Sequence, residues 1–133
     1  MRAKALWTVA VFLLIVARAS AHHSFAAEFD ENKRVKVTGV VILLEWTNPH
    51  AWLAVDAKDE QGVITHWRFE MGSPNMLVRQ GWHRTAIKAG DQVTVEGYAA
   101  KDGSNMANAR SVSLPDGTKI FAGSPGGEGG PSR

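Results

Sequence analysis

The feature that most constrains the fold is a long β-prone run over residues 34–46 with a glycine near its middle. Apolar residues would fall on both faces of an extended chain here: Val35, Val37, Val40, Val41, Ile42, Leu43 and Leu44. A half-exposed strand would instead alternate apolar and polar residues. Gly39 permits a tight bend inside a strand. The run therefore predicts one long strand that coils around the corner of a small barrel, after a polar lead-in over residues 25–33.

Four further segments read as strands, each bounded by turn residues such as Gly, Pro, Asn and Asp. They are residues 51–57, 63–70, 92–99 and 107–114, and a turn after the last leads into Lys119-Ile120-Phe121. Residues 63–70 alternate with a period of two, so Thr65, Trp67 and Phe69 oppose His66, Arg68 and Glu70. The pattern indicates a mainly β protein.

One short helix is expected between the third and fourth strands. Ser73 is a favourable N-cap residue, Pro74 suits the first helical position, and Gly81 is a typical helix stop. This order of elements predicts a small OB-like five-stranded Greek-key barrel with one short helix between strands three and four. A small β-sandwich is the alternative.

Residues 1–21 have the three parts of a cleavable export signal. Arg2 and Lys4 provide the positive start, an apolar run follows, and Ala19-Ser20-Ala21 gives a small-x-small cleavage pattern. The apolar run, of about thirteen residues, is shorter than the roughly 20 that span a bilayer as a helix. We expect Sec-type export to the periplasm and no stable membrane insertion after cleavage. Residues 22–122 then form one domain, and the Gly/Pro/Ser-rich tail 123–133 is expected to be disordered.

Composition limits the chemistry of the mature chain. There is no cysteine, which excludes disulfides and thiolate metal sites. Arg2, Lys4 and Arg18 lie in the signal, so 12 of the 15 basic residues remain against 13 acidic ones, a net charge of −1. A chain near neutrality lacks the positive surface that binds phosphate backbones, so we expect no nucleic-acid partner.

Cleavage after Ala21 would leave His22 as the N-terminus, followed by His23. The free α-amine and the imidazole of His22 can chelate Cu(II), and a second imidazole would complete a site that resembles a histidine brace. Cleavage after the alternative pattern Ala17-Arg18-Ala19 would instead place His22 third, which gives a square-planar Cu(II) motif. Copper is favoured over zinc at such an amine–imidazole site. In the competing interpretation, both histidines are solvated and bind nothing.

His50 follows a turn formed by Thr47, Asn48 and Pro49. One interpretation makes it a third metal ligand, held rigidly on the loop after the first strand. The other makes it a structural residue that hydrogen-bonds to the backbone. We expect His66 to share a solvated strand face with Arg68 and Glu70, and His83 to be a surface residue.

The mature chain is rich in tryptophan, and large side chains are what a small domain without disulfides needs for its core. We assign Trp46 and Trp67 to that core. Trp52 and Trp82 lie beside a turn and a helix end, where they could form a ligand or partner surface. The sequence contains no nucleophile elbow, phosphate loop or dinucleotide fingerprint, so we expect a binding protein rather than an enzyme.

Several segments together resemble an uncharacterised family of exported bacterial proteins, domain of unknown function 6152. They are residues 22–25, 46–52, 70–74, 79–82, 90–95 and 113–117. The resemblance covers nearly the whole mature chain in the expected order. It implies an exported single-domain protein and no particular activity.

Three functions compete at this point. The favoured one is a periplasmic copper carrier, delivery protein or sensor that uses His22, His23 and His50 and serves a membrane or periplasmic protein partner. The alternative is a metal-independent module that binds a ligand or a protein. A copper oxidase or monooxygenase is the least favoured, because a small barrel with a single tyrosine, Tyr98, offers little substrate surface.

Overall fold

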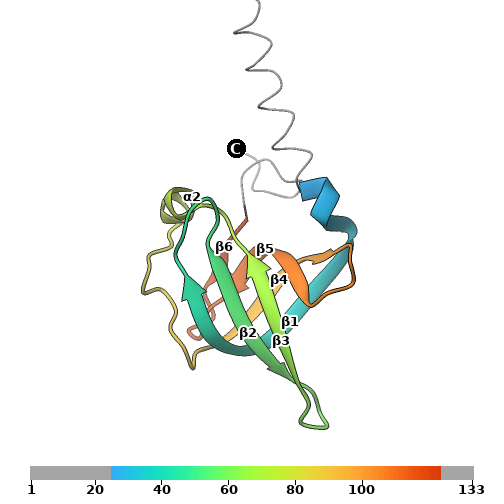
Figure 1. Cartoon of the computed structure of the whole chain (residues 1–133). Helices are drawn as coiled ribbons and strands as arrows, with labels where there is room; N and C mark the ends of the chain where they lie inside the picture. The colour runs from blue at the N-terminus through green and yellow to red at the C-terminus, as the bar shows by residue number, and fades with distance from the viewer. Residues whose placement is uncertain (1–24, 124–133) are drawn as a thin grey trace, which may run out of the picture.

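Strand β1 (Phe29–Glu45) organises the molecule, because it pairs with a different neighbour along each of its halves. The structure is a computed structural model that describes residues 25–123, so the expected signal and most of the tail lie outside the described residues. The other elements are β2 (Trp52–Lys58), β3 (Ile64–Glu70), α2 (Pro74–Arg79), β4 (Gln92–Ala100), β5 (Met106–Ser113) and β6 (Lys119–Phe121). A short helix over residues 25–28 precedes β1 (Figure 1).

The two halves of β1 meet near Gly39. From Phe29 to Val40 the strand is antiparallel to β4, and from Val40 to Glu45 it is antiparallel to β2. A Cβ atom at Gly39 would overlap the carbonyl oxygen of Asp56 and lie 2.7 Å from the Val55 side chain. The predicted coiled strand is confirmed, and glycine is needed because β2 crowds the bend.

The strands close into a ring. β2 pairs with β3, and β4 pairs with β5, in both cases antiparallel. A short parallel pairing then joins β3 to β5 through three residue pairs, of which the last is Glu70 with Asn108. We call this parallel pairing the seam. β6 adds to the outer edge of β5.

The interior of the ring holds one main apolar core. Its largest fully buried side chains are Trp82, Phe69, Leu53, Met71, Leu77, Val41, Val55, Val93, Val95 and Val112. Inward and outward residues alternate along β2 and β3 as the sequence pattern predicts, with Leu53, Val55 and Phe69 facing inward. A second, smaller cluster joins Phe25, Phe29 and Tyr98 beside the short helix.

Local signals placed α2 well. Ser73 is its N-cap and accepts a hydrogen bond from the Met76 amide at 3.4 Å, Pro74 is the first helical residue, and Gly81 has a φ of +97°. The expectation of a single helix was wrong, because residues 25–28 form another. No helix within residues 25–123 is both long and apolar enough to cross a membrane.

Two further expectations need correction. β1 begins at Phe29 and not at residue 34, because Phe29 pairs with Ala100 and draws a polar stretch into the sheet despite its weak strand propensity. The described chain also has six strands and not five, since Lys119–Phe121 pairs with β5 as β6.

Candidate functional site

The turn before β2 holds His50 at one end of the ring. The Thr47 hydroxyl donates a hydrogen bond to the carbonyl oxygen of His50 at 3.0 Å. The next residue, Ala51, donates its amide to the Gly72 carbonyl at 3.0 Å and accepts a bond from the Met71 amide at 2.9 Å. These main-chain bonds tie the turn to the end of β3, so the backbone of His50 has little freedom.

The ring of His50 is oriented by the chain that follows β3. Its Nδ1 lies 2.9 Å from the carbonyl oxygen of Met71 and 3.6 Å from Oε1 of Glu70. A carbonyl oxygen only accepts hydrogen bonds, so Nδ1 carries the proton and donates it. In the neutral ring Nε2 then keeps its lone pair. The side chain is 37% exposed, so a ligand can approach it.

Glu70 lies beneath His50 at the last residue pair of the seam. Its side chain is only 15% exposed, and the side chain of Asn108, which is 4% exposed overall, hydrogen-bonds to it. Burial raises the pKa of Glu70, and the negative charge of Glu28 raises this pKa further. His50 and the Asn108 hydrogen bond act in the opposite direction. We call His50, Glu70 and Asn108 the His50 cluster.

The start of the described chain lies close to this cluster. Figure 1 shows the short helix at residues 25–28, the turn before β2 and the end of β3 at the same end of the ring. The Phe25 ring is 5.6 Å from that of Phe29 and 6.0 Å from that of Tyr98. The Lys101 amide donates to the Glu28 carbonyl at 2.8 Å, and the Lys101 ammonium donates to the carbonyl of Ala26. These contacts fix the polypeptide just after His22 and His23, which lie outside the described residues.

His66 and His83 are both surface residues, as predicted. His66 is exposed and pairs with Asp56, with Nδ1 2.6 Å from the carboxylate oxygen. His83 is also exposed, and its Nδ1 lies 3.1 Å from the Thr85 hydroxyl. Within residues 25–123, no three or more His, Cys, Asp or Glu side chains form a group that could hold a metal ion.

The two tryptophans proposed as a ligand surface differ sharply. Trp82 is 2% exposed and its indole nitrogen donates to the Phe121 carbonyl at 2.8 Å, so its assignment to a surface was wrong. The chain after α2 folds back onto the ring and carries this side chain into the core. Trp52 is partly exposed, and the guanidinium of Arg68 lies 4.5 Å from its ring centroid.

Sequence reasoning missed the buried polar pair of Glu70 and Asn108. Glu70 was expected on a solvated face with His66 and Arg68, but β5 covers that end of β3 and removes its carboxylate from water. No local sequence pattern distinguishes Asn108 from the residues around it. The one available signal was the position of Glu70 at the end of a strand, next to the Gly72-Ser73-Pro74 turn.

Taken together, the fold and the cluster define a small, mainly β protein with a closed ring of strands and an oriented histidine at one end. The chain belongs to a family of unknown function, DUF6152, which its sequence matches over residues 11–109. The search for similar curated proteins gives no match.

Proposed function

We propose that the ring is an OB-like barrel and that the protein is an exported copper-binding protein. The order of pairing supports the fold, because β1, β2, β3, β5 and β4 follow one another around the ring and β4 returns to β1. The parallel seam and a helix between β3 and β4 are features that such barrels share. β6 is an addition at the edge.

In this proposal, Cu(II) is bound by the α-amine and imidazole of His22 together with Nε2 of His50, and His23 contributes as a further ligand. The observation that carries the proposal is the hydrogen bond from Nδ1 of His50 to the Met71 carbonyl. Metal-binding histidines usually donate their other ring N–H to a carbonyl or carboxylate, which fixes the tautomer and orients the ring. Glu70, 3.6 Å from the same nitrogen, adds a negative charge behind it.

Only a short stretch of chain separates Phe25 from the expected mature terminus. His22 precedes Phe25 by three residues, which extend at most roughly 11 Å. Phe25 is anchored against Phe29 and Tyr98, and Glu28 is close enough to Glu70 to influence its pKa. A short reach from a fixed point favours a defined site over a freely moving terminal chelate.

The role that suits such a site is carriage, delivery or sensing of copper in the periplasm, with a membrane or periplasmic protein as partner. An α-amine has an ordinary pKa of about 7.7–8.0, so copper must displace its proton at neutral pH. Affinity should therefore fall as the pH falls.

Calorimetry with Cu(II) on protein recovered after export tests this proposal. We expect one equivalent to bind to a chain that begins at His22, and much weaker binding to the same chain with its α-amine blocked by an acetyl group. His22→Ala should have the same effect, whereas the matched control His66→Ala should leave the affinity unchanged. Intact mass establishes the N-terminus of each sample. Equal affinity with a free and with an acetylated α-amine would refute the terminal-amine site.

A metal-independent binding module is the second candidate. The observation in its favour is the face around Trp52 and Arg68, where the guanidinium of Arg68 lies 4.5 Å from the Trp52 ring centroid. This face would then be the binding surface. Correctly processed protein that takes up no copper would favour this function.

A further inference from the structure

A groove lies on the outside of the ring, and none of its lining residues belongs to the His50 cluster. It has a volume of about 420 Å³ and is formed where β1, β4 and β5 adjoin. Arg34 pairs with Tyr98 and Lys36 pairs with Glu96 across β1 and β4, while Arg110 comes from β5. We call it the arginine groove; Arg34, Val35, Lys36, Glu96, Gly97, Tyr98 and Arg110 line it.

The charges on Arg34, Lys36 and Glu96 do not cancel. Glu96 is the one carboxylate among the lining residues, and two lysines already neutralise it, with Nζ of Lys119 at 2.9 Å and Nζ of Lys36 at 3.6 Å. The hydrogen bond from Lys119 lowers the pKa of Glu96, with smaller contributions from the charges of both lysines. Arg34 is exposed and forms no ion pair with any residue in the range 25–123. Arg34 therefore adds a positive charge to the groove that Glu96 does not balance.

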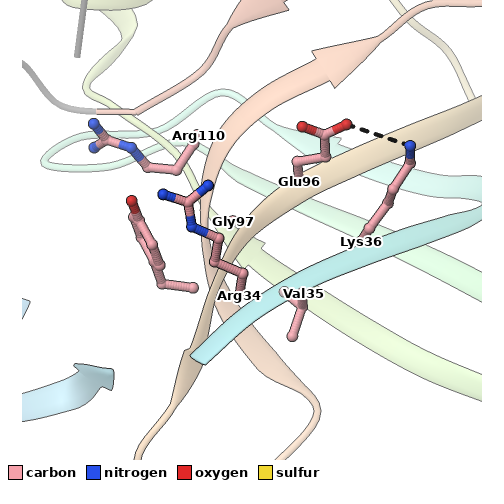
Figure 2. Close-up of a pocket in the computed structure, with 7 residues that line it drawn as sticks. Arg34, Val35, Lys36, Glu96, Gly97 and Arg110 are labelled. Carbon is pink, nitrogen blue, oxygen red and sulfur yellow. Dashed lines mark ion pairs between the residues drawn. The ribbon is translucent and has the colours of Figure 1, made fainter. Parts of the chain in front are cut away.

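Arg110 is held in place before any ligand arrives. Its guanidinium carbon lies 5.1 Å from the ring centroid of Phe121 and 5.8 Å from that of Tyr98. Stacking of this kind restricts the side chain to few conformations, so binding costs less conformational entropy. Figure 2 shows the guanidinium groups of Arg34 and Arg110 toward one side of the groove, and the Lys36–Glu96 ion pair toward the other.

We propose that the arginine groove binds a small oxyanion, a carboxylate or phosphate group, between the guanidinium groups of Arg34 and Arg110. The planar guanidinium matches both kinds of oxyanion because it donates two parallel hydrogen bonds. Lys36 stays with Glu96 and closes the opposite side of the groove. This site uses none of the residues proposed to bind copper.

The test is a nuclear magnetic resonance titration of the full mature protein with sodium phosphate and, separately, with sodium succinate. Sodium chloride keeps the ionic strength constant. We expect saturable shifts in the Gly97 amide and the Arg110 side-chain N–H signals with at least one probe, and the stronger probe distinguishes a phosphate from a carboxylate ligand. Absence of saturation with both probes would overturn the proposal.

Variants separate a specific site from general charge attraction. Arg34→Ala should weaken binding by about tenfold or more, since a charge-assisted hydrogen bond contributes roughly 1.5–3 kcal/mol. Arg110→Lys keeps the charge but loses the paired donors, and should weaken binding as well. The matched control Arg79→Ala removes the same charge from the exposed face of α2 and should change nothing. Equal weakening by Arg79→Ala and Arg34→Ala would show that no specific site exists; because Arg34 is exposed, its replacement leaves the fold intact.

Discussion

The long ladder of β1 and the short seam between β3 and β5 close the same ring in different ways. β1 forms eight residue pairs with β4 and five with β2, whereas the seam has three. The β1 ladder buries apolar side chains such as Val37 and Val41. The seam brings Glu70 and Asn108 together beside His50. The difference teaches that stability comes mainly from the apolar interior, and that the seam is where the fold can hold polar groups in a fixed arrangement.

The largest effect should follow from removing the biggest side chain of the interior. Trp82→Ala deletes a fully buried indole and its hydrogen bond to Phe121, and should lower the free energy of unfolding by about 3–5 kcal/mol. The partly exposed Trp52 provides the control, and Trp52→Ala should cost less than half as much. Urea denaturation followed by circular dichroism measures both. Similar losses in the two variants would mean that the interior does not dominate stability.

A smaller loss is expected at the seam itself. Asn108→Ala removes the side-chain hydrogen bond to Glu70 and leaves a largely buried carboxylate less well satisfied, at a cost of about 1–3 kcal/mol at pH 7. Asn105→Ala, at an exposed position three residues earlier, is the matched control and should be near neutral. The same denaturation experiment separates them. If both variants behave alike, Asn108 does not support Glu70.

The pH dependence of folding stability gives a further test of the seam, because it depends on the ionisation of Glu70. Its pKa in the folded protein is raised above the ordinary value of 4.5, chiefly by burial. The folded state therefore binds the proton of the Glu70 carboxyl more tightly than the unfolded state does. As the pH rises above 4.5, ionisation of Glu70 lowers the free energy of unfolding. Glu70→Gln removes the ionisation, so the metal-free variant should gain stability relative to wild type between pH 4 and pH 7. A stability difference that stays constant over this range would contradict the raised pKa.

Local sequence patterns predicted the strands of the β1 ladder, but they could not predict that β3 pairs with β5 at the seam. Alternation along residues 63–70 identified Phe69 as inward-facing because each side chain in a strand follows its neighbours with a period of two. Whether Glu70 faces water depends instead on β5, whose contact with β3 spans 38 residues of sequence and has no local signature. The same reason explains the early start of β1, which pairing with Ala100 imposes on a polar stretch.

The candidate site was predictable in part. The turn at residues 47–50 singled out His50, and the structural alternative, a hydrogen bond to the backbone, is confirmed by its contact with Met71. That bond is also what would orient a metal ligand, so the two interpretations of His50 are compatible. Trp52 and Trp82 had equivalent local surroundings, and only the path of the chain after α2 distinguishes the exposed ring from the buried one.

The central claim is that His50, held by Met71 and Glu70, completes a copper site at the mature N-terminus. Electron spin echo envelope modulation of the one-to-one Cu(II) complex tests it directly, because the method detects the remote nitrogen of each coordinated imidazole. We predict that His50→Ala loses one imidazole from the count observed in wild type, whereas His66→Ala loses none. An identical imidazole count in wild type and His50→Ala would contradict the account.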